Sequence, residues 1–394
     1  MKVLYISTLV SQELLGQLYD TNHRNPGFAV QKFHRLLTQG LIANGVEVNA
    51  LSAFPTSFES NKRILFQLKS EKENGVDIHY AFFLNLPVLR HICLFFASFF
   101  RTLGWGLKER KNKTVICDVL NISVCIGALW ASKIVGVKCV GIMTDMPGLM
   151  VGGQQKKLKN KVVSSVNKSY LAGFSHYVFL TEQMNQVINC HNRPYIVMEG
   201  LVDVEMAQST TIHNKTLQKR IVLYAGGLHE KYGLKMLVDA FMQLPDTDIQ
   251  LSLYGSGPME SYINECASND KRIVYYGVRP NDEIVAAELL ATLLVNPRPT
   301  HEEFTKYSFP SKNMEYMVSG TPLLTTALPG MPKEYYPYVF LFEEETTIGY
   351  YDSLKGVLSL PRIELINKGH QAKEFVLKEK NNNMQAQRIS DLVK

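Results

Sequence analysis

Short apolar runs alternate with amphipathic segments along the chain, and this alternation restricts the fold more than any other feature of the sequence. In the first half, strands are expected at Val3–Ser7, Val46–Leu51, Thr114–Cys117, Lys138–Thr144 and Tyr177–Thr181. A long polar loop is expected after the first of these strands, up to about Pro26. The segment Phe28–Ala43 then carries apolar residues at helical spacing. Strands that alternate with helices in this way are typical of parallel α/β sheets.

The second half of the chain starts the same rhythm again. Strands are expected at Arg220–Ala225, Ile249–Tyr254, Ile273–Tyr276, Ala291–Val295 and Pro322–Thr325. An amphipathic helix is expected from Leu234 to Leu244. Between the two halves, Asn192–Gln218 shows little periodicity and marks a domain boundary.

A chain of 394 residues is too long for one ordinary domain, and it suits two domains of roughly 180 to 200 residues each. We therefore expect two doubly wound, Rossmann-like α/β domains that face each other across a cleft, at residues 1–195 and 196–375. Residues 376–394 are expected to form a C-terminal helix that packs back toward the first domain. Such domains bind ligands at the carboxyl ends of their strands, which favours a nucleotide-binding architecture but leaves the reaction open.

The charge is unevenly divided between the halves. Residues 1–190 hold 21 Lys and Arg against 11 Asp and Glu (net +10), and residues 191–394 hold 21 against 25 (net −4), which together give +6. A basic first half indicates an anionic partner, either phosphate groups or an anionic membrane face. A chance fluctuation on a solvated surface is the alternative.

Several classes of protein are disfavoured by the sequence. No signal peptide is expected, and no window reaches the roughly 18 to 20 apolar residues of a membrane-spanning helix. The six cysteines show no C-x-x-C pair, which favours buried free thiols in a reducing cytoplasm over disulfides or a zinc site. No metal and no other cofactor is expected, and no nucleic acid is expected as a partner.

Four stretches of the second half, in this order, carry a family resemblance. They are Ile196–Asp203, Val222–Leu244, Leu253–Pro258 with Val274–Val278, and Ser308–Pro322. Together they resemble the retaining GT-B glycosyltransferases of family four (glycosyl transferases group 1). The resemblance covers about residues 196–330 well and the first half only loosely. It implies transfer of a sugar from a nucleotide diphosphate, with the acceptor in the first domain and the nucleotide sugar in the second.

The last of these stretches places Glu315 early on a helix. In the family, the carboxylate at this position holds the ribose, and Ser308, Phe309 and Pro310 lie in the donor site. The family has a second glutamate eight positions earlier, where this chain has Tyr307, so the E-x7-E motif is incomplete. The alternative role for Glu315 is that of an ordinary carboxylate near a helix start.

The family stabilises the departing diphosphate with an arginine and a lysine after the first strand of the second domain. Here Gly227 stands at the arginine position and Lys231 keeps the lysine position. Lys312 or Arg298 can replace the missing guanidinium, and Lys312 is the favoured candidate. Gly226 beside Gly227 leaves room for phosphate, although a tight turn explains both glycines equally well.

Other positions in the second half take their roles from the resemblance alone. Gly255 and Ser256 would line the nucleotide pocket, and Tyr276 and Gly277 would hold the base. A βα turn without any ligand is the alternative for Ser256.

Two positions in the first half complete the predicted site. Asp145 follows a buried strand and would orient or deprotonate the acceptor hydroxyl, or else simply cap the next segment. Gly27 stands where the family has a glycine-rich turn against the donor phosphate.

The sequence therefore predicts a cytoplasmic hexosyltransferase whose donor is a nucleotide-diphosphate sugar, with UDP-sugar favoured. Its acceptor is expected to be a glycan or a lipid-linked molecule, in cell-surface polysaccharide synthesis. Apolar residues of Pro87–Lys113 with a basic end, and the basic run Gln154–Lys161, favour a peripheral position at the inner membrane face. A core helix with a solvated face explains the first segment equally well. Two alternatives remain for the protein: a sugar-nucleotide epimerase of the GT-B fold, and a degenerate, non-catalytic partner subunit.

Overall fold

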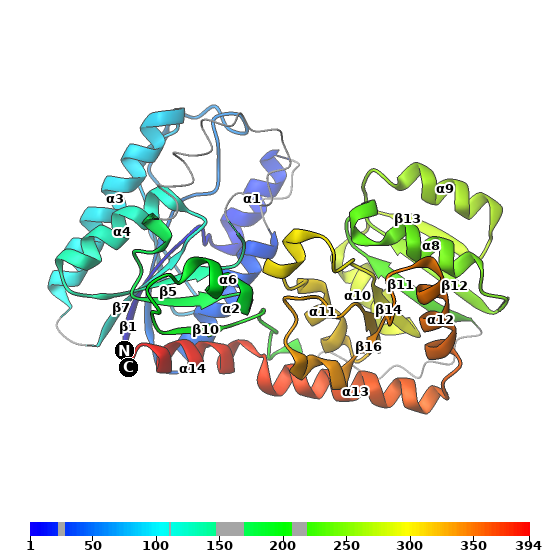
Figure 1. Ribbon diagram of the computed structural model, residues 1–394. Helices are drawn as coiled ribbons and strands as arrows, with labels where there is room; N and C mark the ends of the chain where they lie inside the picture. Colours follow the sequence, from blue (N-terminus) through cyan, green and yellow to red (C-terminus); the bar gives the residue numbers. More distant parts are fainter. Residues whose placement is uncertain (23–27, 110–111, 147–168, 207–218) are drawn as a thin grey trace. The chain divides into compact units, whose positions relative to one another are not determined.

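The computed structural model describes residues 1–22, 28–109, 112–146, 169–206 and 219–394. The chain forms two compact units (Figure 1). Unit 1 is Met1–Leu201 together with Asn382–Lys394, and unit 2 is Val202–Asn381. The sequence predicted the corresponding boundaries after residues 195 and 375. The last helix of the chain thus belongs to the same unit as the first strand.

Unit 1 is built on an eight-stranded sheet with the strand order β10-β9-β8-β7-β1-β2-β5-β4. Its strands are β1 (Lys2–Ser7), β2 (Glu47–Ser52), β4 (Glu71–Glu73), β5 (Val76–Tyr80), β7 (Lys113–Asp118), β8 (Lys138–Met143), β9 (His176–Phe179) and β10 (Tyr195–Val197). The pairs are parallel except for the edge strand β4, which runs antiparallel to β5. Two short strands, β3 (Leu65–Phe66) and β6 (Phe83–Leu84), pair antiparallel with each other.

The helices of unit 1 are α1 (Gln12–Asn22), α2 (Phe28–Ala43), α3 (Pro87–Lys108), α4 (Ile122–Ile134), α6 (Glu182–Ile188) and α14 (Asn382–Leu392). The predicted helix Phe28–Ala43 is confirmed, but the predicted polar loop after the first strand is wrong because α1 occupies it. Leu15 and Leu18 are buried there, so one apolar edge on an otherwise polar helix is enough to hold it against the unit. Such an edge is a weak periodic signal in sequence.

The C-terminal helix α14 packs against α2. Ala386 and Ile389 are fully buried in one cluster with Leu37 and Leu41 of α2 and with apolar residues of the sheet. Polar contacts fix the start of α14, since Asn44 Nδ2 donates to the Asn383 carbonyl at 2.8 Å. The cluster places the last residues of the chain in the core of unit 1.

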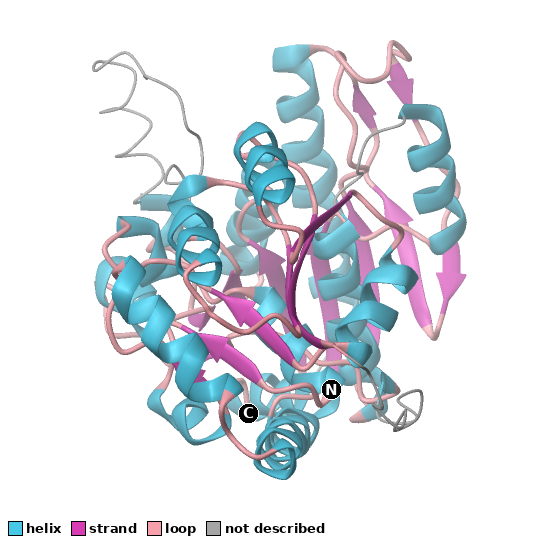
Figure 2. Cartoon of the chain, turned by 90° about the vertical axis from the view of Figure 1, so that its right-hand side faces the viewer, coloured by secondary structure: helices cyan, strands magenta, loops and turns pink. Residues whose placement is uncertain are grey.

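Unit 2 is built on a six-stranded parallel sheet with the order β13-β12-β11-β14-β15-β16. The strands are β11 (Arg220–Ala225), β12 (Ile249–Tyr254), β13 (Ile273–Gly277), β14 (Leu293–Asn296), β15 (Leu323–Thr325) and β16 (Phe340–Leu341). The helices are α8 (Leu234–Met242), α9 (Glu260–Asn269), α10 (Asn281–Leu290), α11 (Ser311–Ser319), α12 (Thr347–Leu358) and α13 (Arg362–Glu379), with short 3-10 turns η1 (Glu230–Tyr232), η2 (Glu303–Tyr307) and η3 (Lys333–Tyr338). Figure 2 shows helices around the parallel strands.

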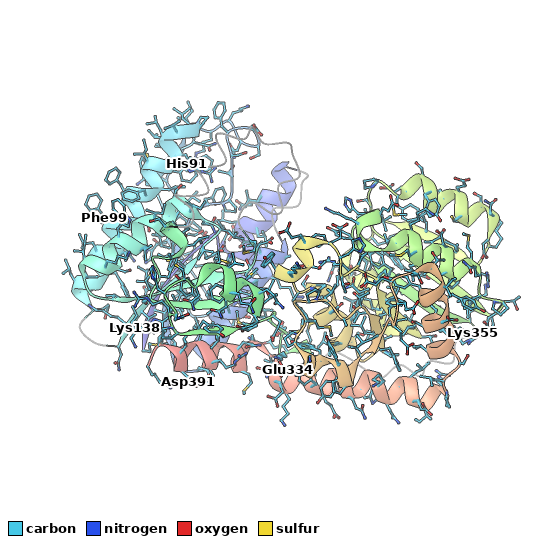
Figure 3. All side chains as sticks on the ribbon, viewed as in Figure 1. His91, Phe99, Lys138, Glu334, Lys355 and Asp391 are labelled. Carbon is cyan, nitrogen blue, oxygen red and sulfur yellow. The ribbon has the colours of Figure 1, made fainter. Side chains whose placement is uncertain are left out.

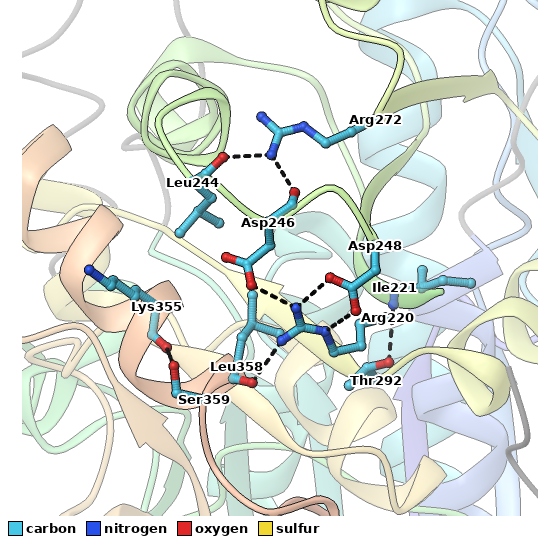
Figure 4. Close-up of polar contacts among 10 residues, drawn as sticks. All are labelled: Arg220, Ile221, Leu244, Asp246, Asp248, Arg272, Thr292, Lys355, Leu358 and Ser359. Atoms are coloured by element: carbon cyan, nitrogen blue, oxygen red, sulfur yellow. Dashed lines mark hydrogen bonds and ion pairs between the residues drawn. The ribbon is translucent and has the colours of Figure 1, made fainter. Parts of the chain in front are cut away.

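One arginine ties together the edge of unit 2 at which β11 begins. The Arg220 guanidinium donates to Asp246 at 2.8 Å, to Asp248 at 2.7 and 2.9 Å, and to the Leu358 carbonyl at the end of α12 at 2.9 Å (Figure 4). A planar guanidinium can hold several acceptors at fixed angles. This contact fixes α12 and the loop before β12 against the first strand of the sheet.

The strand order reverses once in each sheet. In unit 1 the chain proceeds from β1 to β2 and β5 on one side, and from β7 to β10 on the other. In unit 2 it proceeds from β11 to β13 on one side, and from β14 to β16 on the other. The loops that follow the two central strands therefore diverge, which leaves a crevice at their carboxyl ends.

The prediction of two doubly wound α/β domains is confirmed, and every apolar run predicted as a strand overlaps one. Most unpredicted strands are short, and β4 and β16 lie at sheet edges, but the sequence also missed β5, a five-residue strand inside the sheet. The expectation that all cysteines are buried is wrong for Cys190, which is exposed, and for Cys93, which is only partly buried. Within the described part of the chain, no helix is long and apolar enough to cross a membrane.

The docking of α14 gives the first prediction. Replacing Ile389 by Ala should destabilise the protein by about 2 to 5 kcal/mol, because the fully buried side chain leaves a cavity between α14 and α2. Met384 on the same helix is 44% exposed, so Met384→Ala should change stability by no more than about 0.5 kcal/mol. Urea unfolding followed by circular dichroism measures both. Equal midpoints for the two variants would contradict the docking of α14.

A close approach of two loops in unit 2 gives the second prediction. Gly255 follows β12 with φ +124°, and a Cβ there would overlap the Gly226 carbonyl oxygen. Gly255→Ala should therefore destabilise by at least about 2 kcal/mol, since the positive φ and the overlap both penalise a side chain. Gly356 in α12 has open space around its Cα, so Gly356→Ala should keep or raise the melting temperature. Differential scanning fluorimetry compares the two.

Candidate active site

A small pocket in unit 2 lies at the reversal of strand order. Its walls come from the loop after β11, the loop after β14 and the first turn of α11, and the lining residues are Tyr224, Ala225, Gly226, Gly227, Tyr232, Asn296, Arg298, Pro310, Ser311, Lys312 and Tyr316. Its volume is about 90 Å³. At about 30 Å³ per water molecule, this space suits one phosphate-sized group and not a whole nucleotide sugar.

Buried hydrogen bonds hold α11 in place at this pocket. The Tyr316 hydroxyl accepts from the Ala225 N–H at 2.8 Å and lies 3.2 Å from the Ala225 carbonyl oxygen, to which it donates. Asn296 Nδ2 donates to Asn313 Oδ1 at 2.6 Å, which joins β14 to the same helix. Because Tyr316 and Asn313 are fully buried, the start of α11 is fixed relative to the ends of β11 and β14. The amide groups of a helix start carry partial positive charge.

Arg298 brings a largely buried cation to the pocket. Its guanidinium carbon lies 4.8 Å from the ring centre of Tyr232 and 5.5 Å from that of Phe304. Its buried Nε has no hydrogen-bond partner, and it forms no ion pair with any residue that the structure describes. Burial lowers the pKa of the Arg298 guanidinium from its usual value. The aromatic rings compensate the charge only in part, so the pocket presents a positive group without a matching anion.

Lys231 lies over the same two rings. It belongs to η1, and its Nζ is 5.5 Å from the Tyr232 ring centre and 5.7 Å from that of Phe304. Like Arg298, it pairs with no carboxylate of the described segments. Two cations thus share one pair of aromatic rings beside the loop Gly226–Gly227.

Lys312 is placed differently. It lines the pocket, but its Nζ lies 2.9 Å from Glu315 Oε2, one turn along α11, and the two side chains are about one-third exposed. The ion pair partly neutralises both charges. Sequence analysis favoured Lys312 over Arg298 as the substitute for the arginine missing at Gly227, and the geometry favours Arg298, since it is the cation without a carboxylate. The sequence offered both residues as candidates, but their order depends on which side chains pair in space.

The predicted donor residues divide into two groups. Gly226, Gly227, Pro310 and Lys312 line the pocket together. The remaining ones lie outside its lining: Gly255, Ser256, Tyr276, Gly277, Ser308, Phe309, Glu315 and Lys231.

The residues around β12 and β13 have contacts of their own. Tyr276 stacks on Tyr254 with ring centres 4.6 Å apart, and Gly277 accepts the Gly255 N–H at 2.9 Å. Ser256 is exposed, and its carbonyl accepts from the Leu228 N–H at 2.9 Å. These contacts tie the loop after β12 to its two neighbours, so Gly255 has a structural role in addition to its predicted one.

The segment before α11 contains one unsatisfied hydroxyl. The Oγ of Ser308 is buried without a hydrogen-bond partner among the described residues. Phe309 is 5% exposed and packs on Tyr335, so only its backbone is available to a ligand. A buried hydroxyl without a partner is costly in a free protein and is satisfied when a ligand supplies a donor or acceptor.

Of the two predicted residues in the first half, one can be described. Asp145 follows β8 in unit 1, and its Oδ1 accepts from the Met146 N–H at 3.1 Å. Burial raises the pKa of the Asp145 carboxyl, although the Met146 hydrogen bond opposes this. A raised pKa suits a proton acceptor near neutral pH. Gly27 and the basic run Gln154–Lys161 lie outside the described residues.

Comparison with known proteins gives a family match for most of unit 2. Residues 219–358, most of unit 2, match the family model of glycosyl transferases group 1. No curated protein sequence matches the chain.

Solved structures resemble the chain over its full length. A sucrose-phosphate synthase from Thermosynechococcus elongatus has 14% identity and a TM-score of 0.64, covering 100% of this chain and 98% of that one. The lipopolysaccharide outer core galactosyltransferase WaaB has 13% identity and a TM-score of 0.61, covering 100% and 99%. HepE from Anabaena, solved with UDP, has 13% identity and a TM-score of 0.59, covering 99% of both chains. At such identities the likeness establishes the fold, and with the family match over unit 2 it supports a glycosyltransferase of the GT-B fold.

Proposed function

We propose that this protein is a retaining hexosyltransferase that moves a sugar from a UDP-sugar to a glycan or lipid-linked acceptor in cell-surface polysaccharide synthesis. The observation that carries the proposal is a pair of cations without carboxylates at the pocket of unit 2: Arg298 lines the pocket, and Lys231 lies outside the lining over the same aromatic rings. The pocket suits one phosphate group, and the second cation beside it suits the other phosphate of a diphosphate. No metal is required in this scheme, because the two cations meet the charge of the diphosphate.

The chemistry follows from where charge develops. The bond between the sugar C1 and the diphosphate oxygen breaks, and negative charge grows on the departing UDP. Arg298 and Lys231 already lie over two aromatic rings in the free protein. Their positive charges therefore stabilise the departing diphosphate without a reorganisation of solvent. The acceptor hydroxyl attacks C1 from the face that the diphosphate leaves, so the anomeric configuration is retained and no enzyme nucleophile forms a covalent intermediate.

The remaining roles are assigned to residues at the ends of elements. Glu315 on α11 holds the ribose hydroxyls, and it exchanges its ion pair with Lys312 for these hydrogen bonds when the donor binds. Ser308 supplies its unsatisfied hydroxyl to the donor. Asp145 in unit 1 orients or deprotonates the acceptor hydroxyl. Support for a uridine donor comes from Anabaena HepE, which has been solved with UDP and with UDP-glucose.

The proposal includes a peripheral position at the inner face of the membrane, in the cytoplasm. Its support is the exposed apolar surface of α3, on which Val88, Phe100 and Leu107 are each more than half exposed. Not every basic residue nearby is free to contact lipid. Lys113 donates to the Gly106 and Glu109 carbonyls, which binds it to the end of α3.

The third prediction separates ligand binding from folding. Arg298→Met keeps an unbranched apolar side chain and removes a charge that no described carboxylate compensates. The variant should therefore melt at the same or a higher temperature than the parent without ligand, and it should bind UDP at least tenfold more weakly. Its turnover should fall about a hundredfold to a thousandfold. Fluorimetry with and without UDP, calorimetry, and UDP release during sugar transfer give the three readouts.

Three lysine variants complete this experiment. Lys231→Ala should lower kcat more than it weakens UDP binding, because its charge acts mainly as the diphosphate leaves. Lys312→Ala should cost less than either change, since Glu315 already neutralises Lys312. Lys355 also lies over a tyrosine ring, at 5.4 Å, but on α12, and Lys355→Ala should leave activity unchanged. Parental turnover in the Arg298 and Lys231 variants would remove them from the site, and donor conversion without acceptor would indicate an epimerase.

The fourth prediction concerns Glu315. Glu315→Ala should raise the dissociation constant of UDP at least tenfold, because a charged acceptor of ribose hydrogen bonds is lost. Loss of the ion pair with Lys312 should itself cost no more than about 1 kcal/mol of stability, as is usual at exposed positions. Asp352→Ala, at an exposed position of α12, serves as the control. Titration calorimetry with UDP decides, and an unchanged constant would leave Glu315 as a surface carboxylate.

A further inference from the structure

Unit 1 has a pocket of its own at the reversal of its strand order. Its volume is about 650 Å³, and it is lined by residues that directly follow three neighbouring strands: Thr8 after β1, Ala53 after β2 and Leu120 after β7. The first turn of α3 and the loop after β2 close its sides. The carboxyl ends of strands at a reversal are where doubly wound sheets bind ligands. The pocket is large enough for a group of several sugar or phosphate units.

A half-buried arginine is the cation of this pocket, which the exposed carboxylate of Glu59 also lines. Arg90 on α3 lines it, donates from Nη2 to the Phe54 carbonyl at 3.3 Å, and lies 4.9 Å from the Phe83 ring centre. It forms no ion pair with any residue in the described ranges. Burial lowers the pKa of the Arg90 guanidinium. As at Arg298, a charge removed from water without a carboxylate favours an anionic ligand, and a guanidinium suits phosphate in particular.

An apolar groove continues from the pocket along α3 and α4, which pack against each other. Ile92, Phe95 and Phe96 line it with Ile126, in a volume of about 290 Å³, and it shares His91 and Ser123 with the pocket. His91 Nδ1 and Ser123 Oγ lie 2.7 Å apart, and they mark the junction between the two spaces. Figure 3 labels His91 at the junction and Phe99 two turns further along α3.

The surface in and around the groove is exposed and aromatic; Phe96 lines the groove, and Phe100 and Trp130 lie outside its lining. Phe96 is 49% exposed, Phe100 is 63% exposed, and the two rings stack with centres 6.1 Å apart. Trp130 of α4 is 56% exposed and meets Phe95 edge-on at 5.6 Å. Large apolar side chains rarely gather on a surface unless something covers them. The aromatic surface along α3 from Arg90 to Phe100 is roughly 15 Å long, at 1.5 Å per helical residue.

We propose that this pocket and groove bind one amphiphilic ligand, a lipid phosphate, with its phosphate at Arg90 and its hydrocarbon chain along α3 and α4. The pocket that holds Arg90 and the apolar groove adjoin at His91. A free anion would therefore use only the pocket, and a plain hydrocarbon only the groove. The inference rests on the proposed function in one respect: the bound molecule would be the lipid-linked acceptor of the transferase. A plain glycan acceptor would occupy the pocket and leave the apolar groove without a ligand.

Binding of soluble lipid phosphates tests this assignment. The probes are farnesyl phosphate, farnesol and inorganic phosphate, and the readouts are calorimetry and tryptophan emission. The chain has two tryptophans, and Trp105 is buried, so a blue shift on binding reports Trp130 beside the groove. Farnesyl phosphate should bind at least tenfold more tightly than farnesol or phosphate and should shift the emission. Equal binding of farnesol and farnesyl phosphate would overturn the phosphate assignment.

Variants locate the two halves of the ligand. Arg90→Met should weaken farnesyl phosphate about tenfold and leave farnesol unchanged, whereas Phe96→Ser should weaken both. The matched controls are Arg101→Met, an exposed arginine on the same helix, and Ile348→Ser, which is 69% exposed in unit 2. Melting temperatures should stay within a few degrees of the parent for all four. If Arg90→Met and Phe96→Ser bind farnesyl phosphate as tightly as the parent does, the ligand lies elsewhere and the proposal is overturned, whether or not the controls lose binding.

Two further arms distinguish competing occupants. Saturating UDP should not displace farnesyl phosphate; displacement, with loss of binding in Arg298→Met, would place the lipid phosphate in unit 2 instead. Vesicles of phosphatidylcholine and phosphatidylglycerol test a bilayer surface, and Arg90-dependent vesicle binding without farnesyl phosphate binding would assign the face to the membrane. UDP affinity is measured separately, so this proposal can fail while the proposed function stands, and the reverse also holds.

Discussion

Each unit depends on a parallel sheet in which the first strand has parallel neighbours on both sides. β1 lies between β2 and β7, and β11 lies between β12 and β14. Parallel strands end at the same edge of the sheet. At the reversal of strand order, the loops that follow the two neighbouring strands leave in opposite directions, and a crevice remains between these loops. The pocket of unit 1 and the pocket of unit 2 both lie there. The rest of each unit supports these edges.

The two pockets share one electrostatic feature. Each is lined by a guanidinium that packs on an aromatic ring and pairs with no carboxylate in the described part of the chain: Arg90 on Phe83, and Arg298 on Tyr232 and Phe304. In the free protein such a charge costs stability, which the ring contacts offset only in part. An anionic ligand neutralises this charge. The free energy that the unpaired charge costs the free protein is then recovered on binding, which strengthens the binding of the anion. Lys312, already paired with Glu315, contributes less to this difference.

Close backbone contacts and buried polar side chains keep the edges in place. Gly255 allows the loop after β12 to touch the loop after β11, and Gly40 allows α14 to lie on α2, where a Cβ would overlap the Asn382 carbonyl. Tyr316 and Asn313 join α11 to β11 and β14 through hydrogen bonds that are shielded from water. Such bonds are costly to break, because each leaves a buried group without a partner. The start of α11 is therefore a fixed wall of the pocket.

The sequence alone determined the fold class, because buried strands and amphipathic helices leave periodic patterns that local residues suffice to show. It also identified Gly226, Gly227, Pro310 and Lys312, which come together in one pocket. It missed α1, whose apolar edge is weak, and it ranked Arg298 below Lys312. The ranking of the two residues depends on which side chains contact each other in the folded protein. Lys312 forms an ion pair with Glu315 one turn away, whereas Arg298 packs on two aromatic rings. Likewise, only tertiary structure joined Arg90 and the aromatic residues of α3 to the ends of β1, β2 and β7, since the strands that build that pocket lie far apart in the chain.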